Sequence, residues 1–162
     1  MIQALRLMAR YNAWANARLL DACIRAGEDE CARPRPSFFG SILVTLNHVM
    51  VGDLLWMGRF TGRGAPGIDR LDQTLHSSLA RLVPARTALD DTIVVYFDGL
   101  DDDLGRPFTY RTMAGAEATS PLGPTMLHMF NHATHHRGQV HGMLSGTAVP
   151  PPALDLVYFL RG

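Results

Sequence analysis

Histidines cluster in one short stretch of the chain: five of the seven fall between His128 and His141, in the segment LHMFNHATHHRGQVHG. His132 and His136 are four residues apart, and His128 precedes His132 by the same interval. Residues four apart on a helix lie on one face, so either pair can direct two imidazoles at one point, as chelation of a metal ion requires. The spacing alone does not choose between the two pairs.

The pair His132 and His136 resembles the HExxH motif of zinc proteases, in which the Glu after the first histidine is the general base. This chain has Ala133 at that position, so protease chemistry would lack its catalytic group. No other Asp or Glu is placed as an obvious base, and no nucleophile belongs to a triad. The sequence therefore identifies no catalytic residue, and a bound metal would itself have to activate the substrate.

A third ligand is expected from another element, because catalytic metal sites usually have three protein ligands. His48 is the natural donor, since it stands alone in an apolar segment where a buried imidazole without a partner would be costly. Three protein ligands leave a coordination position open, which is typical of catalytic sites. Three neutral imidazoles also leave the ion's positive charge intact, which favours an anionic fourth ligand such as hydroxide or thiolate.

Helices must position these histidines, because apolar residues recur at three- and four-residue intervals in four segments. The predicted helices cover approximately residues 2–26, 41–60, 71–100 and 122–144. Gly27 is well placed to end the first helix, and Ser41 or Ser37 can cap the second. Gly146 lies just past the end of the fourth.

Two segments interrupt this helical pattern. Pro84 cannot be accommodated in mid-helix without a break or kink, so we place the main part of the third helix after it. Phe108, Tyr110 and Thr112 alternate before Gly115, which predicts a short hairpin or an extended excursion. The segment TAVPPPALDLVYFLRG is expected to pack back on the bundle through its apolar residues Leu156, Tyr158, Phe159 and Leu160.

Several polar residues share the helix faces of the histidines. Asn12 and Asn16 lie on the inward stripe of the first helix and need polar partners, which we expect to be backbone groups, with hydrogen bonds to the metal ligands as the alternative. The Gln139 amide can hydrogen-bond a ligand or a bound water, or remain on the surface. Arg137 is expected to pair with a carboxylate or cap a neighbouring element, and Asp53 is a poor fourth ligand.

Composition limits the remaining possibilities. The 162 residues, 47% of them hydrophobic, suit one domain over residues 1–162. Fifteen basic and fifteen acidic residues cancel, which disfavours nucleic acid or a membrane surface as partner. No apolar run approaches the ~20 residues of a membrane span, and no signal peptide is evident, so we expect a cytoplasmic protein. Cys23 and Cys31 are expected to be ordinary thiols, and Trp14 and Trp56 core or interface aromatics, with a pocket wall as the alternative.

Four segments, YNAWAN, LNHVMVGDLLW, NHATHHRGQ and PPPALDLVYFL, resemble the DinB (damage-inducible), or YfiT-like, superfamily of metalloenzymes in their order and approximate spacing. The resemblance covers nearly the whole chain, and HxxxHRGQ is its most specific part. It implies an all-α four-helix bundle in up-down-down-up order, with a long crossover between the second and third helices. It also implies frequent assembly as a homodimer.

The resemblance places the metal ligands on His48, His132 and His136. No family position requires the other four histidines, which we expect to be solvated or structural: His76, His128, His135 and His141. Of these, His128 and His135 flank the ligand face and are the candidates for proton transfer or substrate contact.

We expect one divalent metal ion, zinc or nickel ahead of iron or manganese, because three imidazoles suit these ions to differing degrees. The resemblance further implies a thiol S-transferase or thiol-dependent isomerase, whose partners would be a small thiol such as bacillithiol, mycothiol or glutathione and an electrophilic substrate. Bound as thiolate at the open position, the thiol would need no protein base. The alternatives are a metal-dependent hydrolase that uses bound hydroxide and a non-enzymatic metal-binding stress-response protein.

Overall fold

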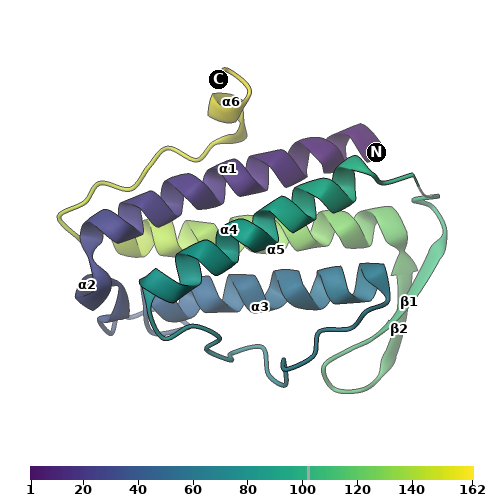
Figure 1. Cartoon of the computed structure of the whole chain (residues 1–162), viewed down its shortest axis with the longest axis horizontal. Coiled ribbons are helices and arrows are strands. Elements are labelled where there is room, and N and C mark those ends of the chain that lie inside the picture. The colour runs from purple at the N-terminus through teal and green to yellow at the C-terminus, as the bar shows by residue number, and fades with distance from the viewer. Residues whose placement is uncertain (102) are drawn as a thin grey trace.

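Four long helices lie side by side in the computed structural model, which describes residues 1–101 and 103–162 (Figure 1). They are α1 (Ile2–Ala26), α3 (Ile42–Thr61), α4 (Leu79–Asp98) and α5 (Leu122–Leu144). The other described elements are the short helices α2 (Glu28–Ala32) and α6 (Leu156–Phe159) and the strands β1 (Pro107–Arg111) and β2 (Glu117–Pro121). None of the described helices combines the length and apolarity that a bilayer crossing needs.

The long helices follow the predicted up-down-down-up order. α1 and α5 run in one direction, and α3 and α4 run in the other (Figure 1). α1 packs against α4 and α5, and α3 packs against α5. Because α3 and α4 are parallel, residues 62–78 return along the bundle as a long crossover. The all-α bundle and its crossover are confirmed.

The helix ends follow local capping chemistry. α1 stops at Gly27, whose φ of 93° lies in the region that favours glycine. The Ser41 hydroxyl caps α3 by accepting a hydrogen bond from the Val44 amide at 3.2 Å. α3 then ends at Gly62, a left-handed C-cap. These bounds agree with the predicted ones within a residue.

The third long helix differs from its prediction. We expected its main part after Pro84, but α4 begins at Leu79 and holds Pro84 inside its second turn. Leu79 and Leu82 are buried, and burial worth about 1.5–3 kcal/mol for each offsets the hydrogen bond that Pro84 cannot donate to the Ala80 carbonyl. Pro84 and Ala80 are both exposed, so water can reach that carbonyl.

The segment between α4 and α5 contains a two-stranded antiparallel hairpin, as the residue alternation predicted. Pro107 pairs with Pro121 at one end, and Arg111 pairs with Glu117 at the other. Gly115 has a φ of 82° in the turn. The hairpin lies against one end of the bundle, beside the start of α5 (Figure 1).

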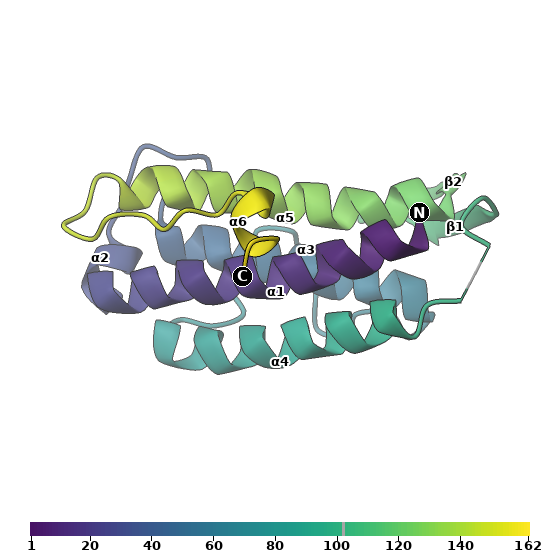
Figure 2. The same cartoon turned by 90° about the horizontal axis from the view of Figure 1, so that it is seen from above.

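The C-terminal segment packs back on the bundle through fewer residues than expected. α6 packs against α1 (Figure 2), where Phe159 lies 6.1 Å from the Tyr11 ring and 5.6 Å from the Trp14 ring. Tyr158 and Leu160 are 48% and 60% exposed, because a single four-residue turn has only one side to bury. Trp14 is therefore a packing aromatic, as expected.

Two apolar clusters fill the bundle, one on each side of a polar layer. The cluster nearer the hairpin includes Leu5, Phe97, Leu122 and Phe130. The other includes Leu19, Leu82, Val140 and Leu144, together with Cys23 and Cys31, both buried free thiols as expected. The layer consists of six buried polar residues that bond to one another: Asn12, Asn16, Asp53, Arg86, Asp90 and Arg137.

The asparagines of this layer bond to side chains on other helices. Asn16 Nδ2 donates to Asp90 Oδ1 at 3.0 Å, and Arg137 Nη1 donates to Asn16 Oδ1 at 3.2 Å and to Asn12 Oδ1. The expectation that backbone groups satisfy the asparagines is wrong, and among the described residues no hydrogen bond joins them to a histidine. Within the described residues Arg137 forms no ion pair with a carboxylate and caps no element, and its Nη2 donates to Thr134 Oγ1 at 3.0 Å.

Arg86 holds the two carboxylates of the layer. Its Nη1 donates to Asp53 Oδ2 and its Nη2 to Asp90 Oδ1, both at 2.6 Å. All three residues are 5% exposed or less. Asp53 is thus committed to Arg86, which agrees with the expectation that it is a poor metal ligand.

Candidate metal centre

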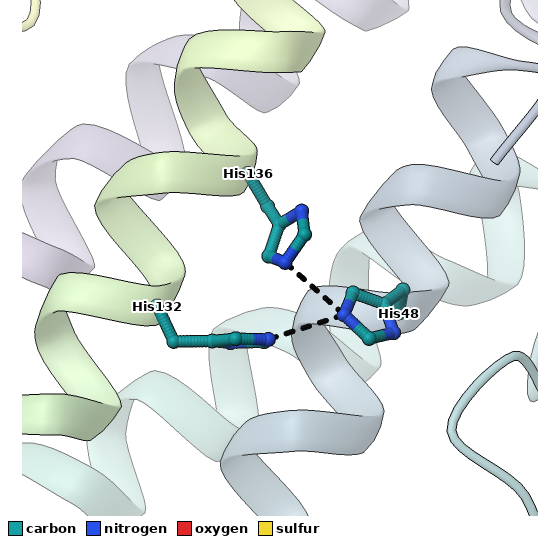
Figure 3. A group of neighbouring side chains, drawn as sticks. All are labelled: His48, His132 and His136. Carbon is teal, nitrogen blue, oxygen red and sulfur yellow. Dashed lines mark hydrogen bonds between the residues drawn. The ribbon is translucent and has the colours of Figure 1, made fainter. Parts of the chain in front are cut away.

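The three histidines singled out by sequence converge between α3 and α5 (Figure 3). His48 Nε2 lies 3.1 Å from His132 Nε2 and 3.2 Å from His136 Nε2. One ligand atom from each of the three residues lies within 4.8 Å of the others, and no Cys, Asp or Glu of the described chain joins the group. Tetrahedral ligands about 2.0–2.1 Å from a zinc ion would be roughly 3.3–3.4 Å apart, so these separations fit a shared ion.

The packing of α3 against α5 creates this convergence. His132 and His136 occupy successive turns of one face of α5, as their spacing predicted. α3 runs antiparallel to α5, and Gly52, one turn after His48, lies against His132. A Cβ built on Gly52 would be 2.8 Å from His132 Cε1. Because Gly52 has no side chain, the His132 imidazole can lie directly against α3.

Hydrogen bonds orient two of the three imidazoles. His48 Nδ1 lies 2.7 Å from the Leu71 carbonyl, and His136 Nδ1 lies 2.8 Å from Gln139 Oε1. Because both partners are acceptors, each Nδ1 carries the proton and each Nε2 presents a lone pair to the centre. The Gln139 contact confirms that its amide bonds a candidate ligand.

Burial keeps the pair on α5 in the neutral form. Burial lowers the pKa of His132 to about 3, and the neighbouring His136 and His48 add to the effect. The pKa of His136 is also lowered by burial, against the opposing effect of its hydrogen bond to Gln139. Both imidazoles are therefore uncharged at neutral pH, which is the form that binds a cation.

One side of the centre is covered by an aromatic ring. Phe39 stacks on His48 with ring centroids 4.1 Å apart and meets His136 edge-on at 5.5 Å. Phe39 comes from the loop before α3, so the loop excludes water from this side. Neither Phe39 nor the Leu71 carbonyl was found from sequence, because a loop aromatic and a backbone group have no spacing signal. Gly52 did offer one, as an isolated glycine inside a helical pattern.

The other side opens into a cavity of about 300 Å³. His48 and His132 line this cavity, together with the aromatic side chains of Trp56 and Tyr110. Trp56 also packs against the apolar core, so it is both a core aromatic, as expected, and a wall of the pocket, which was the alternative. A larger cavity of about 510 Å³ between α1, α5 and the C-terminal segment touches none of the three histidines. The smaller cavity is the one that bears on the chemistry.

A model of the DinB family matches residues 1–162. The chain belongs to the DinB family. It is 24% identical over 157 residues to Protein DinB of Bacillus subtilis (strain 168), and the alignment covers 93% of this chain and 91% of that protein. DinB-family membership and the three-histidine group together fit a protein that binds a divalent metal ion. The identity of the ion, the homodimer and the thiol stay predictions.

The other histidines of this DinB-family protein lie outside the group of three. His128 is exposed and lines the cavity, with its ring 6.2 Å from that of His132. His135 is exposed and bonds Gln139 Nε2 at 3.2 Å. The His76 backbone pairs with the Asn47 side chain, and in the described part of the chain no contact joins its imidazole to the group. His128 is thus the better placed of the two candidates for substrate contact.

Proposed function

We propose that the protein binds one divalent metal ion through His48, His132 and His136. The observation that carries this proposal is the convergence of three imidazoles, two of which have Nε2 freed by a bonded Nδ1. An all-imidazole site suits zinc and nickel and admits iron or manganese. The neutral state of the α5 pair, in which His136 is buried and His132 half-buried, supports the same conclusion, because no proton must be displaced from it at neutral pH.

We further propose that the protein is an enzyme that transfers a small thiol to an electrophilic substrate. A bound divalent ion would supply the acidity, because it lowers the pKa of a coordinated thiol from its ordinary value of about 8.5. The thiol's proton would pass to solvent, its sulfur would bond to the electrophilic carbon, and the leaving group would depart with the electron pair. The group of three contains no carboxylate, which suits a reaction that needs no protein base.

The chain's own residues would position the reactants. Phe39 closes one side of the centre, so reactants would enter from the cavity that His48 and His132 line. The walls of Trp56 and Tyr110 would hold an apolar part of the substrate against the bundle. A hydrolase is the second candidate because His128 lines the same cavity and could move protons from a water molecule.

The reaction class can be tested with the zinc-loaded protein and 1-chloro-2,4-dinitrobenzene, with glutathione, bacillithiol and mycothiol in turn. A thiol of pKa 8.5 is only about 3% ionised at pH 7, so full ionisation would raise the thiolate population roughly 30-fold. We therefore expect thiol consumption to be faster with the metal than without it. The advantage should grow as the pH falls from 8.5 to 7, because the uncatalysed reaction loses its thiolate.

Ester and amide substrates run in parallel separate the candidate functions. Metal-dependent hydrolysis without thiol consumption would contradict the transferase proposal and support the hydrolase. Inactivity with every thiol and ester would favour the non-enzymatic metal-binding protein.

A second test uses Gly52 to separate metal affinity from folding. Gly52→Ala should lower metal affinity roughly tenfold or more, because the new Cβ displaces His132 from the position the other two ligands require. The metal-free variant should be as stable as the parent or up to about 1 kcal/mol more stable, since Ala favours a helix and an unliganded His132 can turn aside. Competition with a chromophoric chelator and thermal unfolding measure the two effects.

Gly142→Ala is the matched control for this substitution. Gly142 also lies within a long helix, on α5, and a Cβ built there meets no heavy atom within 4 Å. The Gly142→Ala variant should bind the metal with the same affinity as the parent protein. Equal affinities for the two variants would show that the close approach of His132 to α3 does not matter for the site.

A further inference from the structure

The cavity beside the metal centre contains a guanidinium at its far end. Arg59 lies eleven residues after His48 on α3, and both line the cavity. Gly52 and Trp56 line it at the intermediate turns, so all four residues share one face of the helix. Eleven residues of helix span roughly 16 Å between the Cα atoms. The cavity therefore runs along α3 from the imidazoles to Arg59.

Two aromatic rings fix the position of this guanidinium. Its carbon lies 4.6 Å from the centroid of Trp56 and 5.1 Å from that of Tyr110. The two rings are 5.1 Å apart and inclined at 66° to each other, so they border the guanidinium without enclosing it, and its N–H groups can donate to a planar carboxylate. These ring contacts also restrict the side chain before any ligand arrives, which lowers the entropy cost of binding.

Arg59 has no acidic partner in the described chain. The ion pairs of the described residues include none with Arg59, and no hydrogen bond from its side chain is present, whereas Arg86 binds two carboxylates. Arg59 is nevertheless half-buried, and burial lowers its pKa. A partly desolvated cation without a counter-charge is costly, and an anionic ligand would remove that cost.

A second polar group in the cavity also lacks a partner. The Thr112 hydroxyl oxygen is buried and has no hydrogen-bond partner within the described residues. Thr112 lines the cavity together with the apolar side chains of Leu55, Leu71 and Met113. Besides His48 and His132, the polar lining of the cavity consists of Arg59, Tyr110, Thr112 and His128, and Arg59 is the only Lys or Arg among these described residues.

We propose that this cavity binds a small organic acid whose carboxylate pairs with Arg59. The apolar body of the acid lies along Trp56 and Leu55, and its reacting end meets the centre at His48 and His132. A single guanidinium matches the single charge of a carboxylate better than a phosphate dianion. The assignment of the reacting end rests on the proposed function, and recognition of the carboxylate by Arg59 does not.

The test compares 8-mercaptooctanoic acid with 8-mercaptooctan-1-ol, two probes of similar length that differ in charge at one end. Isothermal titration of the metal-free protein should show the acid binding about tenfold tighter than the alcohol, as expected for a charge-assisted hydrogen-bonded pair. Arg59→Gln should remove this preference while leaving the alcohol's affinity unchanged within about threefold. Arg59→Lys should keep part of the preference, because it retains the charge and loses the planar fork of N–H donors.

Arg18→Gln is the control, because the Arg18 guanidinium lies over Trp14, 5.0 Å from its centroid, and outside the cavity. This variant should keep the full preference for the acid. Equal affinities of the two probes for the parent protein, or a preference that survives Arg59→Gln, would overturn the proposal. Circular dichroism of each variant checks that it is folded.

Titration of the cobalt-loaded protein separates this inference from the proposed function. If both probes give a thiolate-to-cobalt absorption band, and neither the metal-free nor the cobalt-loaded protein prefers the acid, the thiol chemistry is supported and the role of Arg59 is rejected. A preference for the acid in the metal-free protein, with no thiolate band from either probe, would establish the carboxylate site and reject the thiol chemistry.

Discussion

We expect the affinity for zinc or nickel to fall by more than about 100-fold when His48, His132 or His136 is replaced with Ala. Removing a residue that merely hydrogen-bonds a ligand already costs 10–100-fold, and these substitutions remove the ligand itself. Each variant would leave only two imidazoles, and no carboxylate of the described chain lies close enough to replace the third. Elemental analysis after dialysis and competition with a chelator measure the loss.

Three further variants on the same helix show whether the effect is specific. His128→Ala and His135→Ala should keep one metal ion per chain, because both side chains are exposed and outside the group of three. Gln139→Ala should lose about tenfold in affinity, since it removes the acceptor that orients His136. Loss of metal in His128→Ala, with metal retained after triple replacement of the proposed ligands, would show that the wrong pair was chosen.

The sequence could predict the helices and the candidate ligands because both depend on periodicity. The three- and four-residue apolar repeats set the ranges of α1, α3 and α5, and the four-residue spacing placed His132 and His136 on one face. Spacing left the pair with His128 open, and only the resemblance to the DinB superfamily decided it. The structure shows why the choice matters: His48 meets His132 and His136, whereas the His128 ring contacts Trp56.

Contacts between helices could not be predicted in the same way, because they depend on which faces meet. Nothing in the spacing of Asn12 and Asn16 identifies Asp90 on α4 as their partner. Leu71 contributes a carbonyl, which its side-chain type does not indicate. Pro84 misled the prediction because its cost is local, whereas the burial that offsets it comes from packing.

The polar layer and the metal centre constrain α5 from two different faces. His136 and Arg137 are consecutive on α5, about 100° apart, so one faces α3 and the other reaches α1. Asp53 on α3 connects through Arg86 to Asp90 on α4, which bonds the asparagines of α1. A rotation of α5 or α3 that moved a ligand would also break a buried hydrogen bond. The polar layer therefore holds the three imidazoles in their positions relative to one another.

Arg86→Met should consequently destabilise the protein by about 3–5 kcal/mol, because it leaves two buried carboxylates without their cation. Chemical denaturation of the metal-free protein measures this effect without the contribution of metal binding. Arg10→Met is the matched control, since it breaks the exposed ion pair with Asp98 and should cost no more than about 1 kcal/mol.

The pH dependence of Arg86→Met distinguishes lost charge compensation from lost packing. Burial raises the pKa of Asp90 to about 6, and it also raises that of Asp53, while Arg86 lowers both. Without Arg86 both pKa values should rise further, so between the unfolded value near 4 and the new folded values the native state binds more protons than the unfolded state. The stability deficit relative to the parent should therefore shrink as the pH falls from 7 toward 5. A deficit that stayed constant over this range would indicate that the methionine merely packs poorly, because a cavity does not titrate.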